Sequence, residues 1–340
     1  MFSELVTWYL FLGGAGAALA ALLSLSDLLY GCRTRLAALR GGSRTPSTHR
    51  PRVPCEPEPA FGGGCRTRLA ALRGGSRTPS THPGALAWTD GLSRKLFARG
   101  YAAAGIALLL GVLCLLVDLG RPERFYYVFL RPTASILTFG SFVLGATLCC
   151  AVALGTVALG NLSRVPRPLV HAVEVLCVVC GTATAAYTGA LLAAMAQANP
   201  TWNAALPFLF AFSSFSVGCA GALACLLPFE NAPVAVVRAF ARIDLACIGL
   251  EAVALLTYLA LACVDAGSVS RAALLLWGEG RWSGWAVFAV CALGVPPVLE
   301  VFSLRQGQPL PLAWSLAFVA VGGFFLRACV VGAPAVWGVG

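Results

Sequence analysis

The residues best able to do chemistry in this chain are charged side chains that lie inside long apolar segments. A charged group in hydrocarbon is costly unless something compensates it, so such residues commonly mark ligand sites or proton paths. Seven such residues are the candidates: Asp27, Asp118, Glu174, Asp244, Glu251, Glu300 and Arg327.

The clearest local cluster of charged residues consists of Asp118 and Arg121. Residues three apart share one face of a helix and can pair there, and Pro122 then ends the helix. A salt bridge at the membrane interface explains this cluster as well as a functional role does. Tyr187 lies near the end of an apolar segment. It belongs either to an interfacial aromatic belt or to a pocket in which it donates a hydrogen bond to a carbonyl group.

Composition indicates what kind of protein positions these side chains. Hydrophobic residues make up 59% and charged residues 11% of the 340 residues, whereas soluble domains carry about 25% charged residues. A soluble protein could not cover its surface with so few charges. We therefore predict an all-α polytopic membrane protein whose eight spans cover residues 5–29, 97–119, 135–160, 169–195, 204–227, 233–264, 283–303 and 310–332.

The distribution of Lys and Arg predicts the orientation of these spans. The first loop, residues 31–95, holds eleven Arg and one Lys, whereas the fourth loop holds none. The first loop thus carries most of the difference between odd-numbered and even-numbered loops, and we expect the odd-numbered loops to be cytoplasmic. Because the number of spans is even, both termini are then expected outside.

The net charge of +10 has one main source. Residues 31–95 contain twelve of the 24 Lys and Arg but only three of the 14 acidic residues. Residues 31–49 and 64–82 share one sequence, GCRTRLAALRGGSRTPSTH. Two copies are too few for a solenoid. We therefore interpret this segment as a flexible cytoplasmic loop that carries a tandem duplication, or as an artefact of the reading frame. A patch that binds anionic lipids is the alternative, and no nucleic-acid partner is indicated.

Histidine and cysteine argue against a redox metal in this chain. Its histidines are His49, His82 and His171, and the first two lie in the duplicated loop, so a facing pair for a membrane haem is missing. Cys177 and Cys180 have CxxC spacing inside an apolar segment and are interpreted as structural. No C-x-x-C-H sequence and no ferredoxin-like cysteine run occur. We expect neither haem nor an iron–sulfur cluster here.

Five segments resemble the NrfD/PsrC family, the membrane subunits of molybdopterin and iron–sulfur oxidoreductases such as polysulfide reductase. In order, they are YLFLGGAG from residue 9, VDLGRPERF from 117, YTGALL from 187, the WN…LP stretch of 202–207, and GGFFLR at 322–327. The similarity covers nearly the whole chain except residues 31–95. It implies two four-helix bundles: residues 1–30 with 96–195 form the quinone-site bundle, and residues 196–340 form the second.

The resemblance also implies a function. The chain would bind menaquinone or another quinone near the outer face of a prokaryotic cell membrane. It would exchange electrons with a docked ferredoxin-like iron–sulfur subunit, which serves a molybdopterin catalytic subunit. Four residues would bind the quinone: Tyr9, Asp118, Arg121 and Tyr187. Asp118 would accept a proton, and the two tyrosines would orient the two carbonyl ends. Counting the loops independently puts all four on one side of the membrane.

The remaining acids fall in the middle or inner half of their spans, namely Asp27, Glu174, Asp244, Glu251 and Glu300. They either form a proton path from the cytoplasm or pair with hydroxyl and backbone groups inside the bundles. Two other functions stay open. A secondary transporter predicts inverted repeats, and spans 1–4 and 5–8 are not convincingly similar. A structural anchor would lack a quinone site.

Overall fold

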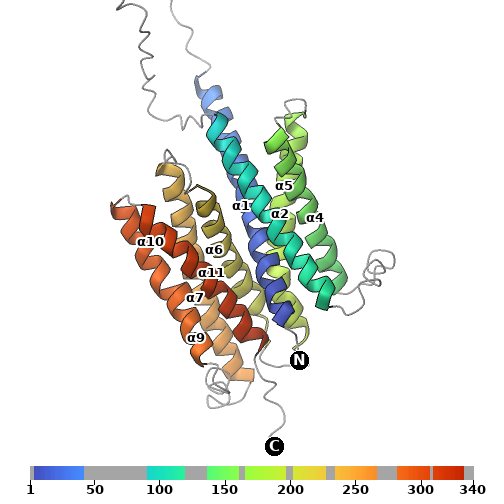
Figure 1. Ribbon diagram of the computed structural model, residues 1–340, viewed down its shortest axis with the longest axis vertical. Coiled ribbons are helices and arrows are strands. Elements are labelled where there is room, and N and C mark those ends of the chain that lie inside the picture. The colour runs from blue at the N-terminus through green and yellow to red at the C-terminus, as the bar shows by residue number, and fades with distance from the viewer. Residues whose placement is uncertain are drawn as a thin grey trace, which may run out of the picture. The chain divides into compact units, whose positions relative to one another are not determined.

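A computed structural model describes residues 4–41, 90–118, 136–160, 165–196, 202–226, 234–265, 282–306 and 309–332. Every regular element among these residues is a helix (Figure 1): α1 (Glu4–Gly41), α2 (Asp90–Asp118), α4 (Ile136–Gly160), α5 (Arg167–Ala194), α6 (Leu206–Leu226), α7 (Val234–Asp265), α9 (Trp282–Phe288), the π-helix η3 (Ala289–Gly294), α10 (Val295–Gln306) and α11 (Pro309–Val331). Most of the duplicated loop lies outside the described residues, and so does Arg121.

The predicted membrane spans are confirmed. Among the residues that the structure describes, eight helical stretches are long and apolar enough to cross a membrane, from Glu4–Leu29 to Trp314–Val331. The seventh, Trp282–Arg305, combines α9, η3 and α10. The chain is therefore a multi-pass membrane protein with an all-α fold.

Both ends of the predicted loop, residues 31–95, are helical instead. Residues 90–95 already belong to α2. Residues 31–41 were expected to begin a loop, yet they continue α1 to Gly41. Arg, Leu and Ala, which dominate this stretch, are strong helix formers. By its contacts the chain divides into two compact units, one of residues 1–29 with 89–340 and one of residues 30–88. The transmembrane helices discussed below belong to the first.

Helix α1 is the most enclosed of the eight spans. In its most apolar window 72% is buried inside the protein, against 28% for α2, α5 and α7. Figure 1 shows α1 running between α2, α4 and α5 on one side and α6, α7 and α11 on the other. Membrane helices gain no hydrophobic energy by leaving lipid for one another, so close backbone packing through small residues holds them together.

Glycines make that close packing possible around α1. A Cβ at Gly218 of α6 would lie 2.9 Å from the Leu19 backbone nitrogen, and one at Gly181 of α5 would lie 2.7 Å from the Ala17 carbonyl oxygen. On α2, a Cβ at Gly111 would lie 3.1 Å from the Gly13 nitrogen. Three neighbouring helices thus approach the α1 backbone directly.

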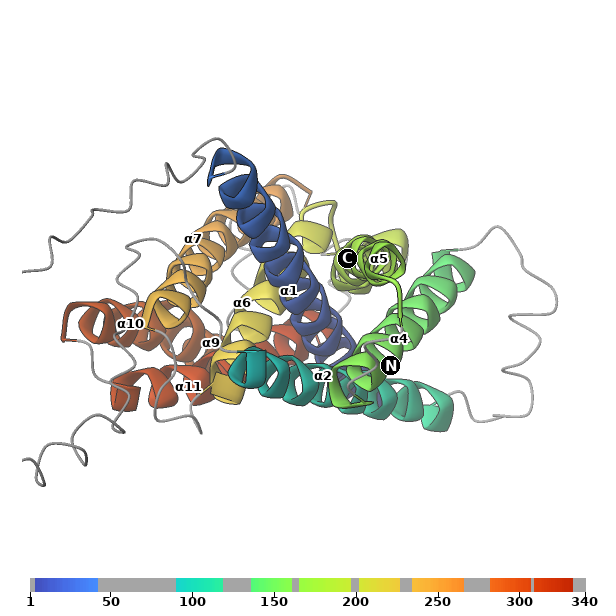
Figure 2. The ribbon, with the colours of Figure 1, turned by 90° about the horizontal axis from the view of Figure 1, so that it is seen from above.

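The remaining helices pack in sequence order around α1. Contacts join α2 with α4, α4 with α5, α5 with α6, and α6 with α7, and α11 packs against α6, α9 and α10. Figure 2 shows α4 and α5 on the opposite side of α1 from α10 and α11. Because α5 and α2 also touch α6, the division into two four-helix bundles stays an interpretation.

We expect the Gly218→Ala substitution to destabilise the protein, because the added methyl group meets backbone atoms that cannot move aside. Overpacking of this kind costs about 1–3 kcal/mol. Gly249→Ala is the matched control, since nothing lies within 4 Å of a Cβ at that position. The thermal midpoint of the purified protein in detergent should fall for Gly218→Ala and hold for Gly249→Ala. Equal midpoints would contradict the packing described here.

Candidate functional site

Two tyrosines predicted to bind quinone meet in the structure. Tyr9 of α1 and Tyr187 of α5 are each 3% exposed, and their side chains are within hydrogen-bonding reach of each other. A third helix completes the site, because any Cβ at Gly140 of α4 would collide with the Tyr187 ring. The glycine therefore provides the space in which the Tyr187 side chain reaches toward α1.

The tyrosine pair lies toward the end of the membrane domain where α1 begins. Helix α2 runs antiparallel to α1, since Gly111 packs on Gly13 while Gly100 packs on Leu23. The end of α2 therefore lies beside the beginning of α1. At a rise of 1.5 Å per residue, Tyr9 is about 6 Å before Gly13 along α1, and Asp118 is about 10 Å beyond Gly111 along α2.

Asp118 thus occupies the same end as the tyrosines, but closer to the membrane surface. Its side chain is exposed, unlike the two buried phenols. Arg121 lies outside the described residues, so the predicted pairing of Asp118 with Arg121 stays a prediction. Of the four predicted quinone-binding residues, the structure brings together Tyr9 and Tyr187 directly and places Asp118 at their level or just beyond it.

The five acids of the predicted proton path separate into two groups. Asp27 and Glu174 form the first group and interact with each other. They lie toward the opposite end from the tyrosines, where α5 begins. His171 Nδ1 is 2.9 Å from Glu174 Oε2, so this histidine extends the group toward the surface. The Glu174 side chain is 1% exposed and that of His171 is 32% exposed.

The second group of acids lies among α6, α7, α10 and α11. Ser216 donates to Asp244 over 2.6 Å, and Ser315 donates to Glu300 over 3.0 Å. Glu251 lies seven residues after Asp244 on α7, which puts both on one face of that helix. All three carboxyl groups are 1% exposed or less.

Arg327 of α11 is a functional candidate to which the sequence alone gave no role. Its side chain is fully buried, and five hydrogen bonds engage the donors of its guanidinium group. Nε donates to Leu10 O (3.2 Å), Nη1 to Gly323 O (2.7 Å) and Ser213 Oγ (3.4 Å), and Nη2 to Ser214 Oγ (2.7 Å) and Phe210 O (3.5 Å).

The surroundings of Arg327 suit a positive charge. The guanidinium carbon lies 5.7 Å from the centre of the Phe11 ring and 5.3 Å from that of Phe210, within the range of cation–π attraction. Glu251 interacts electrostatically with Arg327 and also interacts with Ser213. In the sequence, two signals pointed to this environment of Arg327. They are the arginine itself inside an apolar run and the adjacent Ser213 and Ser214 in the fifth span.

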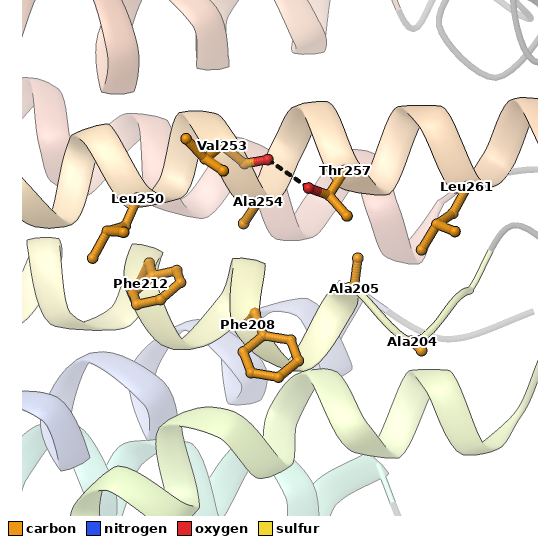
Figure 3. Close-up of a pocket in the computed structure, with 9 residues that line it drawn as sticks. All are labelled: Ala204, Ala205, Phe208, Phe212, Leu250, Val253, Ala254, Thr257 and Leu261. Carbon is orange, nitrogen blue, oxygen red and sulfur yellow. Dashed lines mark hydrogen bonds between the residues drawn. The ribbon is translucent and has the colours of Figure 1, made fainter.

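An apolar cavity of about 300 Å³ lies elsewhere, between α6 and α7. Figure 3 shows Phe212 of α6 opposite Leu250 of α7, whereas the ring of Phe208 extends away from α7. The Thr257 hydroxyl donates to the Val253 carbonyl over 2.9 Å, so it offers no free donor to a ligand. The cavity thus suits hydrocarbon rather than a polar headgroup. Within the ranges that the structure describes, no group of three or more His, Cys, Asp or Glu is arranged to hold a metal ion.

Replacing Arg327 should destabilise the protein. Arg327→Met leaves buried acceptors without donors, which costs on the order of 3 kcal/mol. Arg327→Lys should recover part of the loss, because lysine keeps the charge but lacks the five-donor fork. Arg305→Gln, at an exposed arginine near the end of α10, is the control. Thermal unfolding in detergent measures the series, and equal midpoints for Arg327→Met and Arg305→Gln would refute this role.

Comparison with known proteins agrees with the fold and the motifs. No curated protein matches the chain closely. The family model described as "Polysulphide reductase, NrfD" matches residues 86–336, which contain every span from α2 to α11, while α1 precedes the matched segment. That match covers well over half of the chain. The protein therefore belongs to the NrfD family.

Proposed function

We propose that this protein is the quinone-binding membrane subunit of a respiratory oxidoreductase complex. Proteins of the NrfD family are in general membrane subunits of oxidoreductase complexes. The observation that carries the finer proposal is the buried Tyr9–Tyr187 pair, in which two phenol groups meet near one end of the spans.

The tyrosine pair fits the carbonyl oxygen of a quinone. Each phenol has one O–H donor, and a carbonyl oxygen accepts two hydrogen bonds. A bound carbonyl can therefore replace the contact between the phenols without leaving a buried donor unsatisfied. Because the two hydroxyl groups already meet, we infer that they hold the same carbonyl group rather than opposite ends of the ring. A quinol at this site supplies two electrons and two protons when it is oxidised.

Asp118 is the proposed proton acceptor near this site. It lies at the same end of the membrane domain as the tyrosines and closer to the surface, and its carboxylate is exposed. A carboxylate in this position can receive a proton and release it to water. Arg121, three residues further along, would hold that carboxylate or the headgroup.

The electrons would pass to a docked ferredoxin-like iron–sulfur subunit and from there to a molybdopterin subunit. Family membership supports partner subunits in general, and the resemblance of the five sequence segments supports these particular ones. The Lys and Arg distribution supports an outward position for both termini. Since α1 begins at the tyrosine end, the quinone site would lie near the outer face of a prokaryotic cell membrane.

Removing either phenol hydroxyl should slow quinol oxidation. We expect Tyr9→Phe and Tyr187→Phe each to reduce quinol-dependent reduction of the assembled complex about tenfold, the effect of losing one hydrogen bond to the bound carbonyl. Asp118→Asn should lower the rate while leaving the amount of bound quinone unchanged. Rates are measured with the complex in proteoliposomes, and bound quinone is measured by extraction.

Tyr101→Phe is the matched control for these variants. Tyr101 is a buried tyrosine of α2 that pairs with Ser24 over 3.0 Å, at the opposite end of α1. Its loss should leave the rate close to that of the wild type. Unchanged rates in Tyr9→Phe and Tyr187→Phe, with the complex intact, would remove the site assignment.

A further inference from the structure

Two buried carboxyl groups from different spans face each other within the second group of acids. Asp244 of α7 and Glu300 of α10 are both 0% exposed, and their side chains are within hydrogen-bonding reach of each other. Each also accepts one hydrogen bond from a serine, through Asp244 Oδ1 and Glu300 Oε1. The second oxygens, Asp244 Oδ2 and Glu300 Oε2, are buried and have no donor among the described residues.

Two ionised carboxylates cannot satisfy these oxygens. Neither carries a hydrogen to donate, and like charges repel strongly in a medium of low dielectric constant. A single proton removes both problems, because one carboxyl group then donates its O–H to the other. The free oxygens become a donor and an acceptor, and the pair carries one negative charge instead of two.

The charges near Asp244 and Glu300 favour a shared proton over a salt bridge to a cationic side chain. No Lys, Arg or His in the described part of the chain forms an ion pair with Asp244 or Glu300. The ionisable groups that interact with the pair are Cys219 of α6 and Cys247 and Glu251 of α7. From α11, Ser315 reaches the pair, whereas the Arg327 charge acts on Glu251. Among the described side chains of these helices, no cation acts on the two acids.

An irregular helix positions Glu300. The π-helix η3 widens the seventh span just before α10, with a Val295 N–H to Val290 carbonyl bond, and Pro296 and Pro297 follow, which cannot donate backbone hydrogen bonds. Gly322 of α11 permits close approach, since a Cβ there would lie 2.7 Å from the Ala292 nitrogen. Such π-helical turns are frequent at functional sites, and they shift the register of the residues that follow.

We propose that Asp244 and Glu300 form a proton-binding site inside the membrane domain, in which two carboxyl groups share one exchangeable proton. Ser216 and Ser315 each bond one oxygen of a carboxyl group, and the second oxygens are left for the proton. This site does not depend on the proposed quinone function, because its groups belong to α6, α7, α10 and α11, whereas the tyrosine pair belongs to α1 and α5.

Carbodiimide labelling tests the site on the wild-type protein. Dicyclohexylcarbodiimide enters membranes and reacts with protonated carboxyl groups. The purified chain in nanodiscs, free of quinol, should carry the label on Asp244 or Glu300 in peptide mass spectrometry, and labelling should decline as the pH is raised. The absence of label on both residues would overturn the proposal. Protection by sodium ions at constant pH would also overturn it, because the pair would then bind a metal cation.

Infrared spectroscopy supplies a second readout. The Asp244→Asn/Glu300→Gln double variant should lose one protonated-carboxyl C=O band that shifts in D2O, while Glu4→Gln, at an exposed acid in the first turn of α1, should keep it. Any signal from Glu251 is common to both samples and cancels in the difference spectrum. A double variant that folds and retains the whole band would refute the shared proton.

The Tyr187→Phe variant separates this proposal from the quinone site. It should keep both the label and the infrared band whatever its rate of quinol oxidation. Loss of the label in Tyr187→Phe would mean that the carboxyl pair is not an independent site.

Discussion

The buried guanidinium of Arg327 ties the central helix of the membrane domain to its neighbours. Its Nε donates to Leu10 O of α1, while Nη1 and Nη2 bond groups of α6 and α11. Gly14 of α1 leaves room for it, because a Cβ there would lie 3.2 Å from Nη2. Leu10 directly follows Tyr9, so the arginine helps to fix the part of α1 that carries one half of the tyrosine pair. A buried charge with all its donors engaged cannot shift without breaking several bonds at once.

The polar groups of the described helices are gathered at separate places in an apolar body. The tyrosine pair lies where α1 begins, and the Asp27–Glu174–His171 group lies toward the other end. The buried Asp244–Glu300 pair lies among α6, α7, α10 and α11. Arg327 and Glu251 link the two pairs through a series of contacts. Arg327 donates a hydrogen bond to α1, and Glu251 interacts with both Arg327 and Asp244.

The sequence was sufficient for the number and order of the spans, because length and apolar composition alone decide whether a helix can cross a membrane. Counting loops also predicted that Tyr9 and Tyr187 lie on one side, since each span reverses the chain. The predicted proton path through five acids stays a prediction, and the sequence did not say which acids interact with each other. Asp244 and Glu300 come from spans far apart in the chain, and no periodicity says which helices are neighbours.

Three other features were beyond sequence reasoning for physical reasons. The role of Arg327 depends on acceptors from α1, α6 and α11 that only folding brings together. The space for the Tyr187 ring depends on a missing side chain at Gly140 of another helix. The π-helix η3 arises in a run of small apolar residues that reads as ordinary helix. Such features depend on packing between helices rather than on local pattern.

The proposed joint action of Tyr9 and Tyr187 on one carbonyl group is tested most directly by a double-mutant cycle. The affinity of a fluorescent quinol analogue is measured for the wild type, Tyr9→Phe, Tyr187→Phe and the double variant in nanodiscs. Two hydroxyls that serve one carbonyl should be coupled, so the double variant should depart from the sum of the single losses by about 1 kcal/mol. Strictly additive losses, or no loss in either single variant, would contradict the claim.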